Sequence, residues 1–225
     1  MDYGQPVRFG VFLTPDASQP SRLLALAGLA DELGFDAIGV QDHPYQRRFL
    51  DTWTLLTAIA VRTSRVQVFP DVANLPLRPP AILAKAAASL DLLSGGRVEL
   101  GLGAGGAWEA IKAIGGPVRT PGESVAAVEE AIQVIRLMWS GERGVRFDGK
   151  FYQLAGVQTG PKPLHPIGIW LGAYRPRMPR SSDGPPTDGC RLLDTLSRRT
   201  CSRETAASTK RPQVPAAIHV PSGAS

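Results

Sequence analysis

The segment Val98-Glu-Leu-Gly-Leu-Gly-Ala-Gly-Gly-Ala-Trp108 is a short apolar strand that runs directly into four glycines. Glycine has no Cβ atom, so its backbone can approach a bound group closely and point N–H groups at an anion. The spacing Gly101-x-Gly103-x-Gly105-Gly106 is not the dinucleotide-binding fingerprint. Two interpretations stay open from these residues alone: a phosphate-binding turn, or a tight strand-to-helix turn that needs glycine only for its geometry.

From residue 7 to residue 171, short β-branched runs alternate with amphipathic stretches, which is the pattern of consecutive β/α units over a parallel sheet. Glycine-rich or polar turns follow the strands, and this favours a β/α barrel over a doubly wound sheet. Ser21 and Asp51 are the expected N-caps of the first two helices, and Asp148-Gly149 is the expected turn of a hairpin. The pattern predicts strands at 7–13, 37–40, 65–69, 98–102 and 166–172, helices at 21–33, 51–60, 79–93, 108–114 and 121–139, and the hairpin within 145–152.

The patterned part is short for a complete barrel. The chain has 225 residues, whereas a barrel of eight β/α units needs about 250 or more. We therefore expect an α/β fold, an incomplete TIM-type β/α barrel of about five of the eight units over residues 1–178. Its first and fifth strands would have open edges and apolar faces in contact with water, so a truncated or frameshifted chain, poorly folded and inactive alone, is expected.

Residues 179–225 do not continue the pattern. They are rich in Ser, Thr, Arg and Pro, and such a segment buries too little surface to offset its ordering entropy, so disorder is predicted. An alternative is an out-of-frame tail. If each codon takes the third base of one codon and the first two of the next, Ser182 to Gly189 can become Gly-Arg-Ala-Ala-Asp-Gly-Trp. Codon degeneracy permits this reading without requiring it, and the DNA of the gene tests it.

Composition and charge exclude several functional classes. The net charge is +5, and most of the excess lies after residue 175 without a dense basic run, so we expect no nucleic-acid partner. No signal peptide or long apolar run is present, so we expect a cytoplasmic protein without a membrane partner. Both cysteines lie in the tail and the three histidines are scattered, so no disulfide framework or metal site is expected. A hydrolase is disfavoured because no Ser or Cys stands in an elbow motif.

Four segments in chain order carry a family resemblance over about residues 7–178. They resemble the bacterial-luciferase-like superfamily of flavin- or deazaflavin-dependent oxidoreductases, and the shifted-frame motif resembles the next segment of that family. The resemblance implies a β/α barrel with an insertion after the fourth strand. It also implies a reduced flavin (FMN) or 8-hydroxy-5-deazaflavin coenzyme (F420) across the strand C-termini, with hydride or oxygen chemistry on a small organic substrate. The segments are Gln41-Asp-His-Pro-Tyr45, Phe69-Pro-Asp-Val-Ala-Asn-Leu-Pro-Leu-Arg-Pro-Pro80, Gly101-Leu-Gly-Ala-Gly105 and Trp170-Leu-Gly-Ala-Tyr174.

The resemblance assigns catalytic roles to Asp42 and His43, which match an acidic-histidine pair beside the coenzyme ring. An imidazole can take or give the proton that accompanies hydride transfer, and the carboxylate would fix its tautomer or charge. The alternative interpretation is an N-cap aspartate and a partly buried structural histidine.

Coenzyme contacts are implied at three further places. Asp71-Val72 matches a non-proline cis peptide that supports the ring, and Asn74 falls where an amide could bond ring carbonyl groups, although loop entry and turn chemistry are the plain alternatives. The other matching residues are Gly103, Ala104 and Gly105 near the coenzyme side chain, and Gly172, Ala173 and Tyr174 in the phosphate-side loop. Gly106 stands where the sugar-phosphate dehydrogenase branch has a catalytic glutamate, which disfavours that activity.

The leading hypothesis is thus a luciferase-like oxidoreductase, with the deazaflavin favoured over FMN by the Asp-His pair and the Phe69–Pro80 segment. Whether the protein activates oxygen or only exchanges hydride stays open, as does a homodimer of the folded chain. The alternative from another class is a non-catalytic phosphate- or ligand-binding module with a basic interaction tail.

Overall fold

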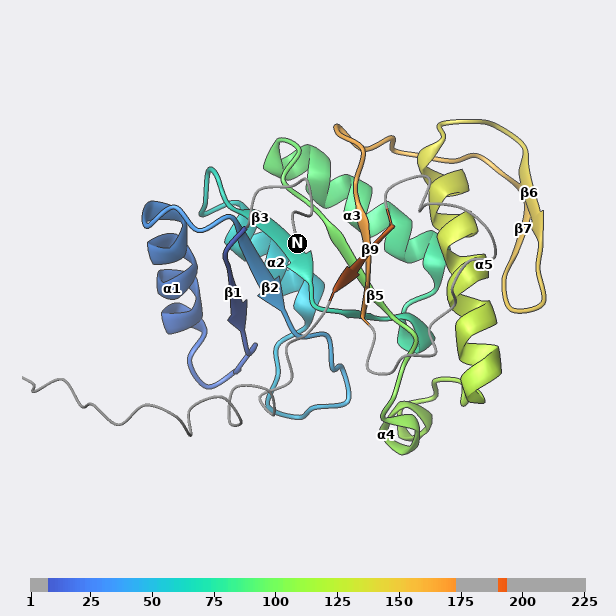
Figure 1. Cartoon of the computed structure of the whole chain (residues 1–225), viewed down its shortest axis with the longest axis horizontal. Coiled ribbons are helices and arrows are strands. Elements are labelled where there is room, and N and C mark those ends of the chain that lie inside the picture. The colour runs from blue at the N-terminus through green and yellow to red at the C-terminus, as the bar shows by residue number, and fades with distance from the viewer. Residues whose placement is uncertain (1–7, 173–189, 194–225) are drawn as a thin grey trace, which may run out of the picture. The chain divides into compact units, whose positions relative to one another are not determined.

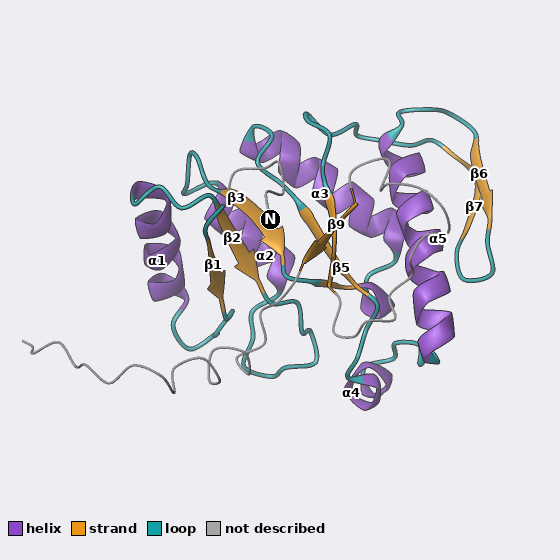
Figure 2. Ribbon diagram, viewed as in Figure 1, coloured by secondary structure: helices purple, strands orange, loops and turns teal. Residues whose placement is uncertain are grey.

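The computed structural model describes residues 8–172 and the backbone of residues 190–193. These residues belong to one compact unit, Met1–Asp194. In it, parallel strands alternate with helices along the chain (Figures 1 and 2). The rest of the expected tail and the segment 173–189 lie outside the described residues.

The parallel strands follow one another in chain order across the sheet. The first three, β1 (Gly10–Leu13), β2 (Ala37–Val40) and β3 (Gln67–Pro70), pair in the order β1-β2-β3. A single bridge between Val68 and Val98 links β3 to the next strands. These pair in the order β4-β5-β8-β9, with bounds β4 (Ala73–Asn74), β5 (Leu100–Gly103), β8 (Ile169–Gly172) and β9 (Cys190–Leu193). Consecutive parallel strands with helical crossovers give the expected partial TIM-type barrel.

Three helices cover the sheet between these strands, and two more follow β5. Asp51 caps the second helix as predicted, because its carboxylate accepts a hydrogen bond from the N–H of Thr54 at 3.0 Å. Gly95 ends the third with φ of 72°, a left-handed conformation that glycine adopts readily. The helices are α1 (Pro20–Glu32), α2 (Thr52–Ala60), α3 (Pro80–Ser94), α4 (Trp108–Ala113) and α5 (Pro121–Trp139).

The core lies between the helices and the sheet. Outward-pointing strand residues such as Ile38, Val68 and Leu100 are fully buried, and they pack against helix residues such as Leu56 and Leu83. The long helix α5 lies against α3, and its Trp139 indole N–H donates to the Ala84 carbonyl at 2.9 Å. This packing fixes the strand ends that carry the candidate site.

Some local predictions are wrong. Ser21 does not cap α1, since the N-cap residue is Gln19 and Pro20 begins the helix. The hairpin strands are β6 (Val145–Asp148) and β7 (Gln153–Val157), so the second strand begins later than predicted. The reason is the Glu130 carboxylate of α5, which accepts hydrogen bonds from the N–H groups of residues 150, 151 and 152 at 2.8–3.1 Å and holds them as a loop.

Two strands were not predicted. β4 and a short 3-10 helix, η1 (Leu75–Leu77), occupy the segment that was expected to be a loop after β3. β9 pairs in parallel with β8 inside the stretch predicted to be disordered, so over these four residues the structure differs from the prediction. Within the described part of the chain, no helix is both long and apolar enough to span a membrane.

Candidate functional site

The C-terminal ends of the strands form the candidate site, and two bonds join β2 to the β3–β4 segment there. The Asp71 N–H donates to the Val40 carbonyl at 2.8 Å. The Asn74 N–H donates to the Asp42 carboxylate, also at 2.8 Å. Asn74 in turn pairs with Gly103 of β5. Residues that are far apart in sequence therefore share one mouth, as the barrel interpretation requires.

Asp42 is the centre of a buried ion-pair network. Its side chain is 1% exposed and accepts two hydrogen bonds from Arg78, both at 2.7 Å, and Arg78 also contacts Asp51 at 2.7 Å. Burial alone would lower the pKa of Arg78, but its bonds to Asp42 outweigh burial and raise that pKa. The described hydrogen bonds of Asp42 go to Arg78 and Asn74, so the expected bond that would fix the His43 tautomer is not formed. Asp42 positions the backbone of the site instead.

His43 follows directly and lies in an aromatic cluster. Its ring stacks on Tyr45 with 5.4 Å between centroids and on Phe49 with 6.4 Å. Burial lowers the pKa of His43 below its usual value, and the charge of nearby Asp42 opposes this shift. Burial thus favours the neutral imidazole, in which one nitrogen can accept a proton.

Asn74 presents an unpaired acceptor at the same mouth. The residue is 7% exposed, and its Oδ1 atom is buried without a hydrogen-bond partner in the described structure. A buried amide oxygen without a partner is costly. Its backbone is fixed by Asp42 and by β5, so the amide cannot move away easily, and a bound group with a donor would satisfy it.

The Val72 side chain packs closely against glycines of two other strands, β5 and β8. A Cβ atom on Gly103 would come within 2.6 Å of a Val72 methyl group, and one on Gly172 within 3.0 Å. A Cβ atom on Gly101 would overlap the Pro70 carbonyl oxygen. Close packing of the Val72 segment therefore explains these glycines, and of the two interpretations of the glycine-rich strand the geometric one accounts for Gly101 and Gly103. The Asp71–Val72 peptide bond is cis, as the family resemblance implied.

Gly105 is explained by a turn rather than by packing against Val72. Its φ is 97°, and a Cβ atom there would come within 2.7 Å of Pro76 and 2.8 Å of the Trp108 ring. Ala104 beside it is half-buried and packs on the core. Gly106 is exposed, and a Cβ atom there would meet nothing within 4 Å. Ala173 and Tyr174 lie outside the described residues, so their implied contacts stay predictions.

Asp71, expected only as part of the cis peptide that supports the ring, also brings a carboxyl group to the site. A Cβ atom on Gly39 of β2 would lie 3.1 Å from the Asp71 Cβ, so this side chain lies over the end of β2. Burial raises the pKa of Asp71 above its usual value. The role of Arg78 was not predicted from the sequence, because only the fold brings its guanidinium to Asp42. A basic residue near a candidate site in the sequence does not by itself indicate such a contact.

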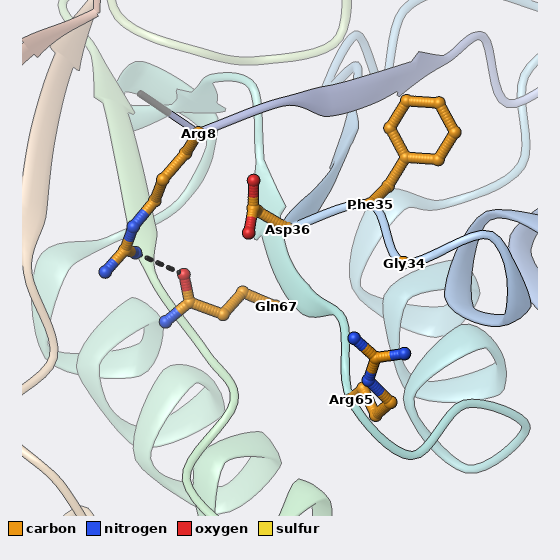
Figure 3. A pocket seen from close by; sticks show the side chains of 6 residues that line it. All are labelled: Arg8, Gly34, Phe35, Asp36, Arg65 and Gln67. Carbon is orange, nitrogen blue, oxygen red and sulfur yellow. Dashed lines mark hydrogen bonds between the residues drawn. The ribbon is translucent and has the colours of Figure 1, made fainter. Parts of the chain in front are cut away.

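A polar hollow at the opposite ends of the strands is a weaker candidate (Figure 3). It has a volume of about 260 Å³ and is lined by residues just before β1, β2 and β3 and by the first residue of β3. Arg8 reaches across it to donate a hydrogen bond to Gln67 at 2.9 Å, and the Asp36 carboxylate accepts one from the Phe9 N–H at 2.7 Å. β/α enzymes bind ligands at the strand C-termini, so these bonds are better explained as ties between strand starts.

Comparison with known proteins decides the family. The family model described as luciferase-like monooxygenase matches residues 5–181. The chain belongs to this luciferase-like family. Residue roles in the site, including those of Asp42 and His43, are not decided by that membership.

Two solved structures and one curated protein illustrate the luciferase-like relatives. An F420-dependent glucose-6-phosphate dehydrogenase of Kineococcus radiotolerans is 34% identical over 77% of this chain and 53% of its own. The coenzyme F420 dependent tetrahydromethanopterin reductase of Methanopyrus kandleri has a TM-score of 0.68 at 27% identity, covering 77% of this chain and 52% of its own. The monooxygenase RslO1 of Streptomyces bottropensis has a TM-score of 0.66 at 28% identity, covering 75% and 54%. The chain thus spans about half the length of these relatives.

Proposed function

We propose that this chain carries the coenzyme-binding half of an oxidoreductase that uses F420 to transfer hydride to or from a small organic substrate. The observation that carries the proposal is the unpaired Oδ1 atom of Asn74 at the mouth shared by β2, β4 and β5. Two of the relatives described above are named for their dependence on F420, which favours the deazaflavin over FMN.

The residues at the mouth fit a flat ring with polar edges. Asn74 would accept a hydrogen bond from a ring N–H, and the Val72 side chain, raised over Gly103 and Gly172, would support one face of the ring. When bound, F420 supplies a carbon that accepts or donates hydride. Because Asp42 and Arg78 fix the backbone of Asn74, the amide would be in place before the ring arrives.

His43 is the proposed proton carrier of the site. Its ring is half-buried and burial favours its neutral form, so a nitrogen can accept a proton released by a substrate hydroxyl group and later return it. Asp42 lies next to it in sequence but is bonded to Arg78 and Asn74, so Asp42 acts on His43 through charge alone.

The substrate class is narrowed by Gly106. That residue supplies no carboxylate where the sugar-phosphate branch is expected to have one, so we propose a substrate other than glucose 6-phosphate. Asp71 provides a different carboxyl group at the end of β3, beside β2.

Titration of the full chain with reduced F420, followed by its fluorescence, tests the proposal. We expect the chain to bind one equivalent of F420. Asn74→Ala should weaken this binding by about tenfold, because it removes one hydrogen bond to the polar ring. Gln153→Ala, an exposed amide on β7, is the matched control and should bind as the parent does.

Titrations with FMN and with inorganic phosphate complete the test. Tighter binding of FMN than of F420 would replace the coenzyme in the proposal. The enzyme site would be contradicted if inorganic phosphate bound with the same affinity as either coenzyme and Asn74→Ala did not change that affinity. This result would support the phosphate-binding module.

A further inference from the structure

Trp108 begins α4, just beyond the C-terminal end of β5 (Figure 1). A Cβ atom on Gly105 would come within 2.8 Å of the Trp108 ring and within 2.7 Å of Pro76, so the indole lies beside η1. Pro76 is two residues after Asn74, whose backbone pairs with Gly103. The half-buried indole therefore stands next to the mouth that carries the proposed coenzyme site.

A second apolar contact fixes α4 on η1. Ile111, one turn after Trp108, is fully buried. A Cβ atom on Gly116 would come within 2.6 Å of an Ile111 methyl group and 2.7 Å of a Leu77 methyl group, so these two side chains lie close together. The short helix thus rests on η1 at two points, Trp108 at Pro76 and Ile111 at Leu77. Packing at both points holds the indole in place.

The β2 side of the mouth is also aromatic. The His43 ring stacks on Tyr45 and Phe49 in the segment that follows β2. Val72 adds an aliphatic side chain between β3 and β4. Aromatic and aliphatic side chains thus follow β2, β3 and β5 at the ends where these strands meet, and such side chains favour an apolar ligand.

The ion-pair network at this mouth carries no excess of positive charge. Arg78 donates hydrogen bonds to Asp42 and to Asp51. One guanidinium is thus matched by two carboxylates, and a third anion beside them would be repelled. Burial also raises the pKa of Asp71, which favours its uncharged form. A neutral substrate therefore fits this network better than a carboxylate or a phosphate.

We propose that Trp108 selects a neutral substrate with a flat apolar ring, such as an aromatic ketone or the corresponding secondary alcohol. This inference rests on the proposed function and names the substrate class of the same site. Aromatic rings gain affinity from offset-stacked or edge-to-face contact with an indole, beyond the area that they bury. When the alcohol is oxidised, its carbinol C–H bond gives hydride to oxidised F420, its O–H bond gives the proton to a nitrogen of His43, and a C=O double bond forms.

Binding without turnover tests the proposal. The full chain is saturated with oxidised F420, which cannot react with a ketone because neither of them donates hydride, and two ketones are titrated in by calorimetry. The probes are acetophenone, a neutral aromatic ketone, and 4-acetylbenzoate, the same ketone with one carboxylate. We expect acetophenone to bind at least about tenfold more tightly, because the carboxylate would lie unpaired beside the acidic network.

Two substitutions at the mouth locate the contact. Trp108→Ala should weaken acetophenone binding by about tenfold and leave F420 binding unchanged. Gly106→Lys should strengthen 4-acetylbenzoate binding by about fivefold, because a Cβ atom there meets nothing within 4 Å and the ammonium group would pair with the carboxylate. Phe9→Ala is the matched control. Phe9 is 67% exposed at the opposite ends of the strands, so this variant should bind both probes as the parent does.

Several results would overturn the proposal. One is equal or tighter binding of 4-acetylbenzoate by the parent chain, which would assign a free cation such as the exposed Arg47 to the site. Another is equal weakening by Trp108→Ala and Phe9→Ala. A third is loss of F420 affinity in Trp108→Ala, since Trp108 would then shape the mouth rather than contact the substrate. The last is an unchanged affinity of Gly106→Lys for 4-acetylbenzoate, and this variant decides the outcome if Trp108→Ala does not fold.

The same titrations separate this inference from the proposed function. If the parent chain does not bind F420, the proposed function and the substrate class are both wrong. If the chain binds F420 but does not discriminate between the two ketones, only the substrate class is wrong.

Discussion

The two ends of the parallel sheet treat their polar groups differently. At the N-terminal ends, Asp31 and Asp91 each accept hydrogen bonds on both carboxylate oxygens, and Arg97 donates to carbonyl groups of residues 60, 63, 66 and 94. At the C-terminal ends, Asn74 Oδ1 has no partner and the Asp71 carboxyl is half-buried.

The difference agrees with the proposal that one end serves stability and the other holds a ligand. Buried polar groups normally find partners within the protein, and those that do not mark places where another molecule completes the bonding. The N-terminal end has one exception, the buried Nε2 atom of His165, whose other nitrogen contacts Asp91 at 2.8 Å. The exception stands beside a saturated carboxylate, whereas Asn74 Oδ1 lies at the mouth shared by β2, β4 and β5.

The largest effect is expected from Asp91→Ala at the N-terminal end. Asp91 is fully buried and accepts from the N–H groups of Leu164, His165 and Val98. Removing it leaves these donors unpaired, so we expect the free energy of unfolding to fall by about 3–5 kcal/mol. Urea denaturation measures this. The control is Glu32→Ala, which removes an exposed carboxylate on α1 and should change stability by less than about 0.5 kcal/mol. If both variants lost the same free energy of unfolding, the contrast between fully bonded and exposed carboxylates would be wrong.

A smaller loss of stability is expected from Gly101→Ala, which tests the close packing of the glycines against the Val72 segment. The added Cβ atom would overlap the Pro70 carbonyl, so the β3–β4 segment must shift, at a cost of about 1–3 kcal/mol. Gly28→Ala in α1 is the control of opposite sign, because a Cβ atom there meets nothing within 4 Å and alanine favours helix by up to about 1 kcal/mol. Thermal unfolding compares the two variants, and a Gly101→Ala protein as stable as the parent would show that this packing is not tight.

The smallest effect is a difference in pH dependence between Asp71→Asn and Asp31→Asn. Burial raises the pKa of Asp71, so the folded chain holds a proton that the unfolded chain has lost, and stability falls as pH rises through this range. Asp71→Asn should therefore stabilise the protein at pH 7 but not near pH 3.

Asp31 should behave in the opposite way. Burial would raise its pKa, but hydrogen bonds from Ser64, Val66 and Arg65 outweigh burial and lower it. Its stabilisation is present above the unfolded pKa and is lost as pH falls through the folded one. Asp31→Asn should thus destabilise at pH 7 and lose this effect in acid. Unfolding free energies from pH 3 to pH 8 compare the pair, and parallel profiles would contradict the assignment of the two ends.

Local pattern was enough to predict the order of the main strands and helices and the partial barrel. Apolar periodicity and the Asp51 cap are both encoded within a few residues of the elements that they define. The Ser21 cap and the hairpin bounds were wrong because Pro20 and the distant Glu130 override the local signal. β4 was missed because two residues carry no period.

The site was predictable in its members but not in its bonding. The motif segments brought Asp42, Asn74 and Gly103 into the prediction, and the fold joins them. The bonding of Asp42 depends on Arg78, which directly follows β4 and η1, so the path of that segment brings its guanidinium to Asp42. The predicted disorder over the undescribed part of the tail and the shifted reading frame stay predictions, and one DNA read across codons 170–225 tests the latter.

The Glu130 carboxylate attaches the β6–β7 loop to α5 by three consecutive amides, with no bond from that loop to the barrel strands among the described hydrogen bonds. These bonds tie the hairpin to α5, and its side chains also pack on α3 and on the main core. Insertions or deletions that keep these bonds and this packing should leave the parallel strands unperturbed. This makes the hairpin the natural position for a label or an affinity tag.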